Sequence, residues 1–214
     1  MFFHQPLSAP RKYVGRLCIS LYRGWVRSRS KLFSVLISGA FCSFGRKTVL
    51  MCPIRLEGAG RIAIGDHVFI GPGSWLQTLP DIPSNTVGIS IGKGTRVAGS
   101  CVISAVRSVT IEENVLLARN VYISDHIHKY TEAGVPIMYQ GVEKIEPVHI
   151  KRGAWLGQNV VVCPGATVGQ GAVVGANSVV LHDVPDFSVA VGAPARVVRM
   201  ICAPEITFAN PLKS

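Results

Sequence analysis

Residues 150–185 read IKRGAW LGQNVV VCPGAT VGQGAV VGANSV VLHDVP, and these six consecutive hexapeptides decide the fold. Each opens on an aliphatic residue (the first on Ile150) and carries a small or aliphatic residue four positions later. A period of six matches neither an amphipathic helix nor an alternating strand. It predicts a short strand and a tight turn, three of which close a triangular coil with the aliphatic residue inside. Stacked coils then share one continuous core.

The same period recurs upstream, with interruptions. It is present at Ile64, Ile70 and Leu76, at Ile91, Val97 and Ile103, and at Ile111, Leu117 and Ile123. The spacing from 64 to 91 leaves room for a loop within 77–88, and that from 111 to 150 for a much longer one at 125–147. A regular solenoid has no packing reason to extrude a long loop, and such loops commonly carry function.

These repeats predict an all-β protein, a left-handed parallel β-helix over residues 49–200 with the extruded loop 125–147. Before it, residues 1–48 lose the period and show apolar residues at helical spacings, as at Leu17, Leu21 and Trp25. We expect one or two helices there, packed on the first coil, with Gly15 and Gly24 as weak breaks. Residues 201–214 are expected to form a short C-terminal tail.

The positive charge is concentrated at the N-terminus. The chain has 214 residues and a net charge of +10, and residues 1–56 hold ten Lys or Arg but no Asp or Glu. Basic residues interleaved with apolar ones are typical of a helix that lies on an anionic membrane. We therefore expect residues 1–44 to contact such a membrane. The alternatives are that these cations keep a packed helix soluble, or pair with acidic residues of a neighbouring subunit.

Composition limits the compartment and the class of protein. An apolar content of 48% with 16% charge excludes a disordered chain. No apolar run is long enough to cross a bilayer, and no signal peptide is evident. The six cysteines form no CxxC pair, as expected of reduced thiols. The expectation is a cytoplasmic protein, peripheral on the inner face of the cell membrane, with no nucleic-acid partner.

Two histidines stand at the mouth of the long loop, in SDHIHKY at 124–130. An imidazole that titrates near neutral pH suits a general base, so His126 and His128 are the catalytic candidates. The alternative is that both are surface histidines without a role. A further alternative is zinc, for which Asp125, His126, His128 and His149 could be ligands, as in β-helix enzymes of the carbonic-anhydrase type.

Three residues outside the loop could meet a ligand. Trp155 precedes an inward aliphatic residue, so its ring should face outward, toward a ligand or a neighbouring subunit. Arg196 and Arg199 follow the Pro194 turn, and their guanidinium groups could bind phosphates or simply be solvated.

The stretch from Ile111 to Arg199 resembles the hexapeptide O-acetyltransferases. These comprise the galactoside and maltose acetyltransferases and their relatives in polysaccharide and lipopolysaccharide biosynthesis. The likeness rests on SDHIH at 124–128, AWLGQNVVVCPGATVGQGAVVGANSVV at 154–180 and VAVGAPARVVR at 189–199. It implies acyl transfer from acetyl-CoA to a saccharide hydroxyl in surface polysaccharide biosynthesis, without a metal. It also implies a homotrimer with active sites between subunits. Two variants of this hypothesis are that the saccharide acceptor is lipid-linked, and that the reaction is N-acylation of an amino sugar.

The resemblance assigns residues to the donor and to catalysis. Trp155 matches the tryptophan beside the pantetheine arm, Gln158 and Ala176 match further contacts to the donor, and Arg196 and Arg199 match the arginines at the CoA phosphates. His182 stands where a threonine–lysine pair often meets the nucleotide, which is a departure. The Asp-His motif favours His126 as the base, whereas counting from Ile111 favours His128, which we place first. The acceptor sugar, its hydroxyl and the size of the acyl group stay open.

Overall fold

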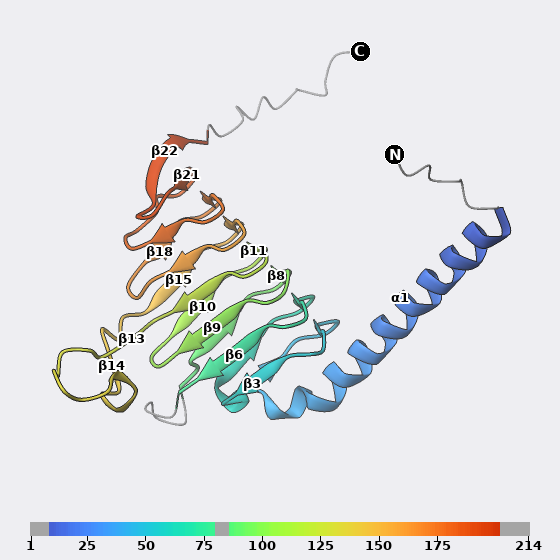
Figure 1. Ribbon diagram of the computed structural model, residues 1–214, viewed down its shortest axis with the longest axis horizontal. Coiled ribbons are helices and arrows are strands. Elements are labelled where there is room, and N and C mark those ends of the chain that lie inside the picture. The colour runs from blue at the N-terminus through green and yellow to red at the C-terminus, as the bar shows by residue number, and fades with distance from the viewer. Residues whose placement is uncertain (1–8, 80–85, 202–214) are drawn as a thin grey trace, which may run out of the picture.

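Three parallel β-sheets form the walls of a three-sided stack of coils, which Figure 1 shows from the side. The computed structural model describes residues 9–79 and 86–201; the tail expected at 201–214 therefore lies almost wholly outside the described residues. The first wall consists, in order, of β1 (Ser43–Phe44), β4 (Ile62–Ile64), β7 (Ile89–Ile91), β10 (Val109–Ile111), β15 (Val148–Ile150) and β18 (Thr167–Val168).

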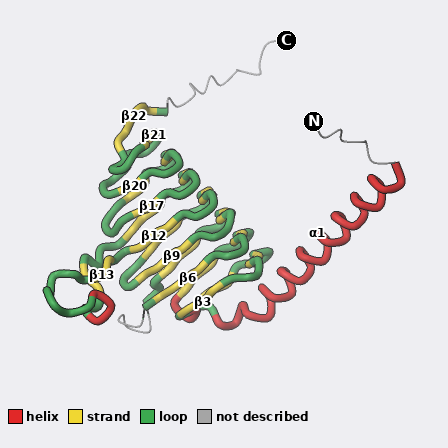
Figure 2. The backbone as a smooth tube through the Cα atoms, viewed as in Figure 1, coloured by secondary structure: helices red, strands yellow, loops and turns green. Residues whose placement is uncertain are grey.

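The other two walls repeat this arrangement. The second wall consists of β2 (Val49–Leu50), β5 (Phe69–Ile70), β8 (Arg96–Val97), β11 (Leu116–Leu117), β16 (Trp155–Leu156), β19 (Val173–Val174), β21 (Ser188–Val191) and β22 (Arg196–Met200). The third wall consists of β3 (Arg55–Glu57), β6 (Trp75–Thr78), β9 (Val102–Ala105), β12 (Tyr122–Ser124), β17 (Val161–Val162) and β20 (Val179–Val180). Each coil thus gives one short strand to each wall, which Figure 2 shows as stacked yellow segments.

Backbone hydrogen bonds join each coil to the next in strict register. Leu116 lies beside Trp155, which in turn lies beside Val173. The N–H of Leu116 donates to Ala154 O and that of Trp155 to Ala172 O, both at 2.9 Å. Three parallel walls built on a hexapeptide repeat fit the predicted left-handed β-helix. The last strand, β22, departs from the parallel pattern and pairs antiparallel with β21.

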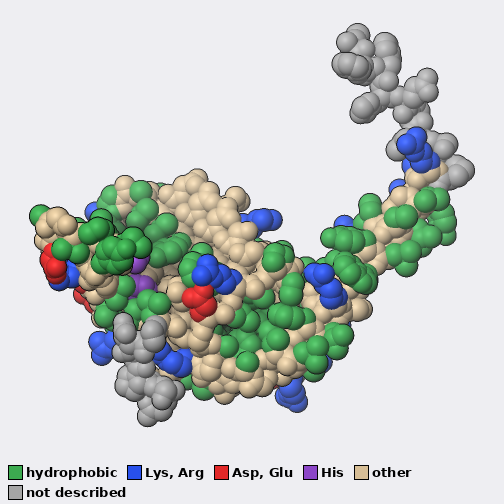
Figure 3. All heavy atoms as spheres, turned by 60° about the horizontal axis from the view of Figure 1, so that its bottom comes forward, with side chains coloured by type: hydrophobic (Ala, Val, Ile, Leu, Met, Phe, Trp, Pro, Cys, Tyr) green, Lys and Arg blue, Asp and Glu red, His purple; other side chains and the backbone are tan. Residues whose placement is uncertain are grey.

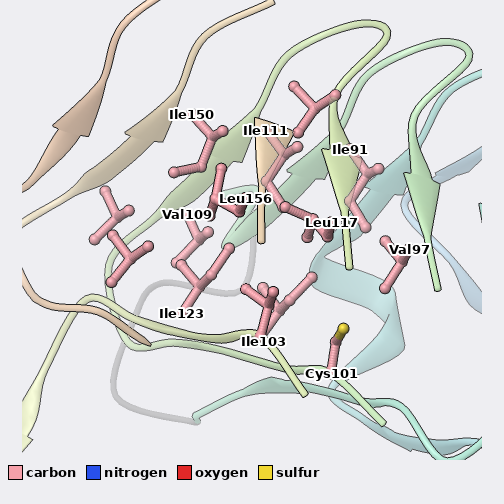
Figure 4. Packing of buried hydrophobic residues seen from close by; sticks show 14 of the residues in the cluster. Ile91, Val97, Cys101, Ile103, Val109, Ile111, Leu117, Ile123, Ile150 and Leu156 are labelled. Atoms are coloured by element: carbon pink, nitrogen blue, oxygen red, sulfur yellow. The ribbon is translucent and has the colours of Figure 1, made fainter. Parts of the chain in front are cut away.

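The predicted inward residues form the core, and Figure 4 shows part of it. The aliphatic residues that open the hexapeptides are no more than 2% exposed: Ile64, Ile70, Leu76, Ile91, Val97, Ile103, Ile111, Leu117, Ile123, Ile150, Leu156, Val162, Val168, Val174 and Val180. The residues four positions later are buried too, as Ala154, Ala166 and Ala172 show. The period-six prediction is confirmed at each of these positions, from Ile64 to Val180.

An asparagine ladder lines the corner between the second and third walls. Asn120, Asn159 and Asn177 occupy equivalent turn positions with φ near +60°, a conformation that asparagine tolerates better than most residues. The Asn120 amide donates to Asn159 Oδ1 at 3.1 Å, and the Asn159 amide donates to Asn177 Oδ1 at 2.8 Å. The ladder ties three successive turns together.

The long loop leaves the stack between β12 and β15. It contains β13 (Ile127–His128) and β14 (Val142–Glu143), which pair antiparallel, and the 3-10 turn η3 (Ile137–Tyr139). The coils on either side stay in register, with Tyr122 beside Val161. Figure 1 shows the loop protruding from one side of the stack. The predicted extrusion is therefore observed, and it does not interrupt the core.

The N-terminal segment is one helix, α1 (Ala9–Ile37), which projects away from the coils (Figures 1 and 2). It runs through both Gly15 and Gly24, the expected weak breaks. Only its C-terminal end packs on the first coil, where Ser30 and Ser34 are buried. The 3-10 turn η1 (Ser38–Ala40) follows, and a second one, η2 (Ala59–Arg61), precedes β4. The first strand begins at Ser43, so the coils start before the boundary expected at residue 49.

Candidate functional site

A cleft lies where the long loop leaves the third wall. Its volume is about 270 Å³, and it is lined by β12, by the start of the loop and by the turn after β17: Tyr122, Ser124, His126, Ile127, His128, Val162, Cys163 and Pro164. In Figure 3 histidine side chains lie in a hollow among hydrophobic ones. The structure therefore brings the two histidines of the SDHIH motif to one cleft.

His126 forms a pair with the residue before it. Its Nδ1 lies 2.8 Å from Asp125 Oδ1. The Asp125 side chain is fully buried and that of His126 is 9% exposed. An ionised carboxylate can only accept hydrogen bonds, so the proton of a neutral imidazole belongs on Nδ1. The other ring nitrogen, Nε2, then keeps a free lone pair.

The backbone before β10 holds the Asp125 carboxylate in place. Asp125 Oδ1 accepts the Val106 N–H at 2.8 Å, and Oδ2 accepts the N–H groups of Arg107 at 2.6 Å and Ser108 at 2.7 Å. Burial raises the pKa of this carboxyl, but the hydrogen bonds from His126 and the backbone outweigh it and hold the pKa below its usual value. Asp125 is thus ionised at neutral pH and orients the imidazole.

Ser124 completes the support of His126. Its hydroxyl donates to the carbonyl oxygen of His126 at 2.8 Å and lies 3.3 Å from Nδ1. His128 differs from His126 because it lies on β13, pairs with Val142 through the backbone and is exposed. The two histidines therefore share a cleft but not an environment.

His149, the fourth residue of the zinc alternative, lies elsewhere. It belongs to β15 on the first wall, and its Nε2 is 2.7 Å from Glu112 Oε1. Burial raises the pKa of Glu112, but hydrogen bonds from the Arg152 N–H and from His149 lower it below the usual value overall. Across residues 9–79 and 86–201, no group of three or more His, Cys, Asp or Glu side chains is placed to hold a metal ion.

Three of the expected donor residues, Trp155, Arg196 and Arg199, lie on strands of the second wall. Trp155 is 48% exposed, as predicted. Successive register partners lead from Trp155 through Val173 and Val189 to Arg199. Three strand spacings of about 4.8 Å place the backbones of Trp155 and Arg199 roughly 14 Å apart along one outward-facing column. Arg196 lies on the same strand as Arg199 and is exposed.

The other expected donor residues lie at turns. Gln158 and Ala176 are exposed beside the asparagine ladder, and the Gln158 carbonyl accepts the Asn177 N–H at 2.8 Å. Backbone packing is tight there, since a Cβ at Gly157 would lie 2.7 Å from Ala176 N. His182 is exposed just after β20. Gln158 and Ala176 thus lie at the corner between the second and third walls. His182 instead follows a strand of the third wall and is in register with Pro164, on the same corner as the histidine cleft.

Sequence reasoning missed several residues of the cleft. Asp125 was predicted as a zinc ligand and as part of the Asp-His motif, but not as a buried anchor of the imidazole, and no site role was predicted for Tyr122, Ser124, Cys163 or Pro164. One signal could have found Cys163 and Pro164: the hexapeptide register aligns them with residues 124–125, because Ile123 pairs with Val162. Burial raises the pKa of the Cys163 thiol, so it lines the cleft as a neutral group.

The repeat region matches the bacterial transferase hexapeptide family (six repeats) over residues 147–182. An Escherichia coli protein named "Putative lipopolysaccharide biosynthesis O-acetyl transferase WbbJ" is 37% identical over 157 residues, which cover 71% of this chain and 78% of that protein. A Mycobacterium tuberculosis protein named "Probable acetyltransferase" is 34% identical over 149 residues. That match covers 62% of this chain but spans only about half, 49%, of the mycobacterial protein.

A solved structure shares the architecture. A galactoside acetyltransferase in complex with coenzyme A has a TM-score of 0.56 and 30% sequence identity, and the match covers 68% of this chain and 66% of that one. The hexapeptide repeat, the proteins named as acetyltransferases and the structure that contains coenzyme A are thus consistent with one another.

Proposed function

The chain belongs to the bacterial hexapeptide-repeat transferase family, and from that premise we propose that it moves an acetyl group from acetyl-CoA to a saccharide hydroxyl. The proposal extends to the pathway, the synthesis of a surface polysaccharide. Support for this acceptor class comes from the name of the E. coli relative and from the galactoside acetyltransferase among the solved structures. Support for the donor comes from the coenzyme A bound to that acetyltransferase.

The Asp125–His126 pair is the observation on which the mechanism rests. A buried, ionised carboxylate 2.8 Å from Nδ1 holds the imidazole in the tautomer whose Nε2 accepts a proton. General-base catalysis of this kind contributes about 10²–10⁴ in rate. We therefore assign the base to His126, with the exposed His128 beside it in the cleft as the second candidate.

Each proton in the transfer can be followed at His126. Its Nε2 removes the proton of the acceptor hydroxyl while the hydroxyl oxygen bonds to the thioester carbonyl carbon. The carbon–sulfur bond then breaks, and the protonated His126 returns the proton to the leaving sulfur. The ester and the free thiol of CoA are the products. Asp125 stabilises the transient imidazolium throughout and stays ionised, because its pKa is held low.

The second wall is the proposed donor site. The exposed Trp155 ring would lie along the pantetheine arm, with Gln158 and Ala176 at the corner beside it. Arg196 and Arg199 would bind the phosphates, and His182 would lie near the nucleotide. Guanidinium groups match phosphate oxygens in charge and geometry. Tyr122 and Ile127 would face the acceptor from the cleft.

The assembly and the location are also proposals. We infer a left-handed β-helix that forms a homotrimer, with each active site completed by a neighbouring subunit. The exposed Trp155 and Leu116 on the second wall would then be partly covered by that neighbour. The reaction would take place in the cytoplasm, and a lipid-linked acceptor would place it at the inner face of the cell membrane.

Release of free thiol from acetyl-CoA tests the activity directly. The purified protein, incubated with acetyl-CoA and a panel of mono- and oligosaccharides, should release thiol with at least one acceptor. The product should carry a new O-acetyl ester by mass spectrometry. Activity that disappears with a chelator and returns with zinc would contradict the proposed mechanism. Thiol release only with amino-sugar acceptors would replace it by N-acylation.

A further inference from the structure

The projecting helix α1 carries a basic face that continues the face packed on the coils. Side chains seven or eleven positions apart lie on nearly the same face of a helix, because these spacings are close to two and three whole turns of 3.6 residues. Arg23 and Arg27 lie seven positions before the buried Ser30 and Ser34. By the same spacing this face bears Lys12, Arg16, Arg23 and Arg27, and Lys31 lies at its edge, four positions after Arg27.

The opposite face of α1 is apolar and points away from the coils. Residues nine positions apart lie on opposite faces, because nine residues make two and a half turns. Leu21 and Trp25 therefore face away from Ser30 and Ser34, and they are 65% and 57% exposed. Exposed neighbours on this face are Val14, Leu17, Leu32 and Leu36. Figure 3 shows hydrophobic side chains along the projecting helix.

The charge of α1 is unbalanced. Its sequence holds seven Lys or Arg and no Asp or Glu. None of the seven forms an ion pair with any residue that the structure describes. Six of the ten carboxylates within the described residues form ion pairs in the coils and the long loop: Glu57, Asp66, Glu112, Asp125, Glu132 and Asp186. Within the described part of the chain, the seven cations of this helix therefore have no carboxylate of their own.

A basic and partly apolar cleft lies at the base of α1. Its volume is about 610 Å³, and it lies between the end of the helix and the first coil. Lys31, Arg46 and Lys47 contribute cationic groups, and Val35 and Phe44 contribute apolar surface. A phospholipid combines the same two characters, because its phosphate is anionic and its acyl chains are apolar.

We propose that α1 lies in the surface of an anionic lipid bilayer. Its apolar face, centred on Leu21 and Trp25, enters the boundary between headgroups and acyl chains, and its basic residues contact lipid phosphates. Each such residue strengthens binding to an anionic surface, and salt weakens that contribution. Within the described residues, no helix is long and apolar enough to cross a membrane. The coils, which pack on the opposite face of α1, stay on the water side.

Vesicle flotation of the full chain tests this proposal independently of acyl transfer. Binding is expected to vesicles of phosphatidylcholine with phosphatidylglycerol, and not to phosphatidylcholine alone, and it should weaken as salt rises. The informative variant is Leu21→Gln, and its matched control is Ile19→Gln. Both residues are exposed aliphatics on the same helix, but Ile19 lies about 160° around the axis from Leu21.

Leu21→Gln should weaken vesicle binding about tenfold or more, since the apolar surface of the leucine side chain is no longer buried in the bilayer. Ile19→Gln should leave binding within about twofold, and circular dichroism should show the same helix content in both variants. Equal binding to neutral and anionic vesicles, or equal loss in the two variants, would overturn the proposal. So would an oligomer that dissociates in Leu21→Gln, with no vesicle binding by the unaltered chain, because the apolar face would then contact another copy.

Discussion

Asp125 Oδ1 lies 2.8 Å from His126 Nδ1, and the same carboxylate accepts three backbone N–H groups of residues 106–108. The turn before β10, which belongs to the preceding coil, therefore sets the orientation of the imidazole at the cleft through Asp125. Two segments nearly 20 positions apart in sequence meet in this one carboxylate.

Replacing each histidine in turn distinguishes the two candidate bases. We expect His126→Ala to lower kcat about 10²–10⁴-fold, because the general base is lost. The KM for acetyl-CoA should change little, since the proposed donor contacts lie on the second wall. His128→Ala should have a much smaller effect on kcat. Steady-state kinetics of both single variants and the double variant measure this, and the reverse ranking would assign catalysis to His128.

Asp125→Asn should reduce stability in a manner that depends on pH. The pKa of Asp125 is lower in the folded protein than its ordinary value. The carboxylate therefore stabilises the fold above a pH of about 4, and that contribution is lost as the pH falls through the lower, folded pKa. Denaturant unfolding between pH 3 and 7 measures the free energy of unfolding of both proteins. The difference between the unaltered protein and the variant should be constant near neutrality and should become smaller in acid. A difference that becomes larger in acid would show that the carboxylate is not held in its ionised form.

The two arginines of β22 should act on donor binding. We expect Arg196→Ala and Arg199→Ala to raise the KM for acetyl-CoA about tenfold, because a charge-assisted hydrogen bond contributes about 1.5–3 kcal/mol. The effect on kcat should be smaller, since the phosphates are remote from the thioester. Arg46→Ala on the first coil is the matched control. An effect of either β22 variant on the KM of the acceptor alone would place the donor elsewhere.

Ser34 should be important for the junction between α1 and the coils. Its hydroxyl accepts the Leu50 N–H at 2.8 Å, on the side of β2 that faces away from β5. Ser34→Ala leaves this buried N–H without its partner and should cost about 1–3 kcal/mol of unfolding free energy. The control is the half-buried Ser38, whose hydroxyl makes a solvent-exposed hydrogen bond to Val35 O; Ser38→Ala should stay within about 0.5 kcal/mol. Equal costs would show that the junction does not depend on this bond.

The walls were predictable from the sequence because their information is local. One aliphatic residue every six positions specifies which side chains enter the core, and a deviation from that spacing specifies where a loop leaves. The direction of α1 was not predictable, because it depends on contacts such as Ser34 with Leu50, sixteen positions apart and without any periodic signal. Helical spacing at Leu17 and Leu21 indicated a helix, but left open whether these side chains would pack on the first coil or be exposed.

The candidate site was predictable in part for the same reason. The histidines are visible in the sequence at the mouth of an extruded loop, and the outward position of Trp155 follows from its place before Leu156. The role of Asp125 depends on the backbone N–H groups of Val106, Arg107 and Ser108, which every residue but proline possesses. No residue type marks that interaction, so the sequence placed His128 before His126, whereas the buried Asp125–His126 pair is the reason for proposing His126.

The two ends of the long loop are hydrogen-bonded to each other at its base, so the loop and the stack of coils can change independently in evolution. The Glu146 N–H donates to Asp125 O at 2.9 Å, and the coils above and below stay in register, so the chain between them can vary without disturbing the stack. Doubling the length of a flexible loop costs only about 0.6 kcal/mol in closure entropy. A lineage could therefore exchange the hairpin at 127–143, and with it the proposed acceptor contacts, while the proposed donor surface on the second wall is inherited unchanged.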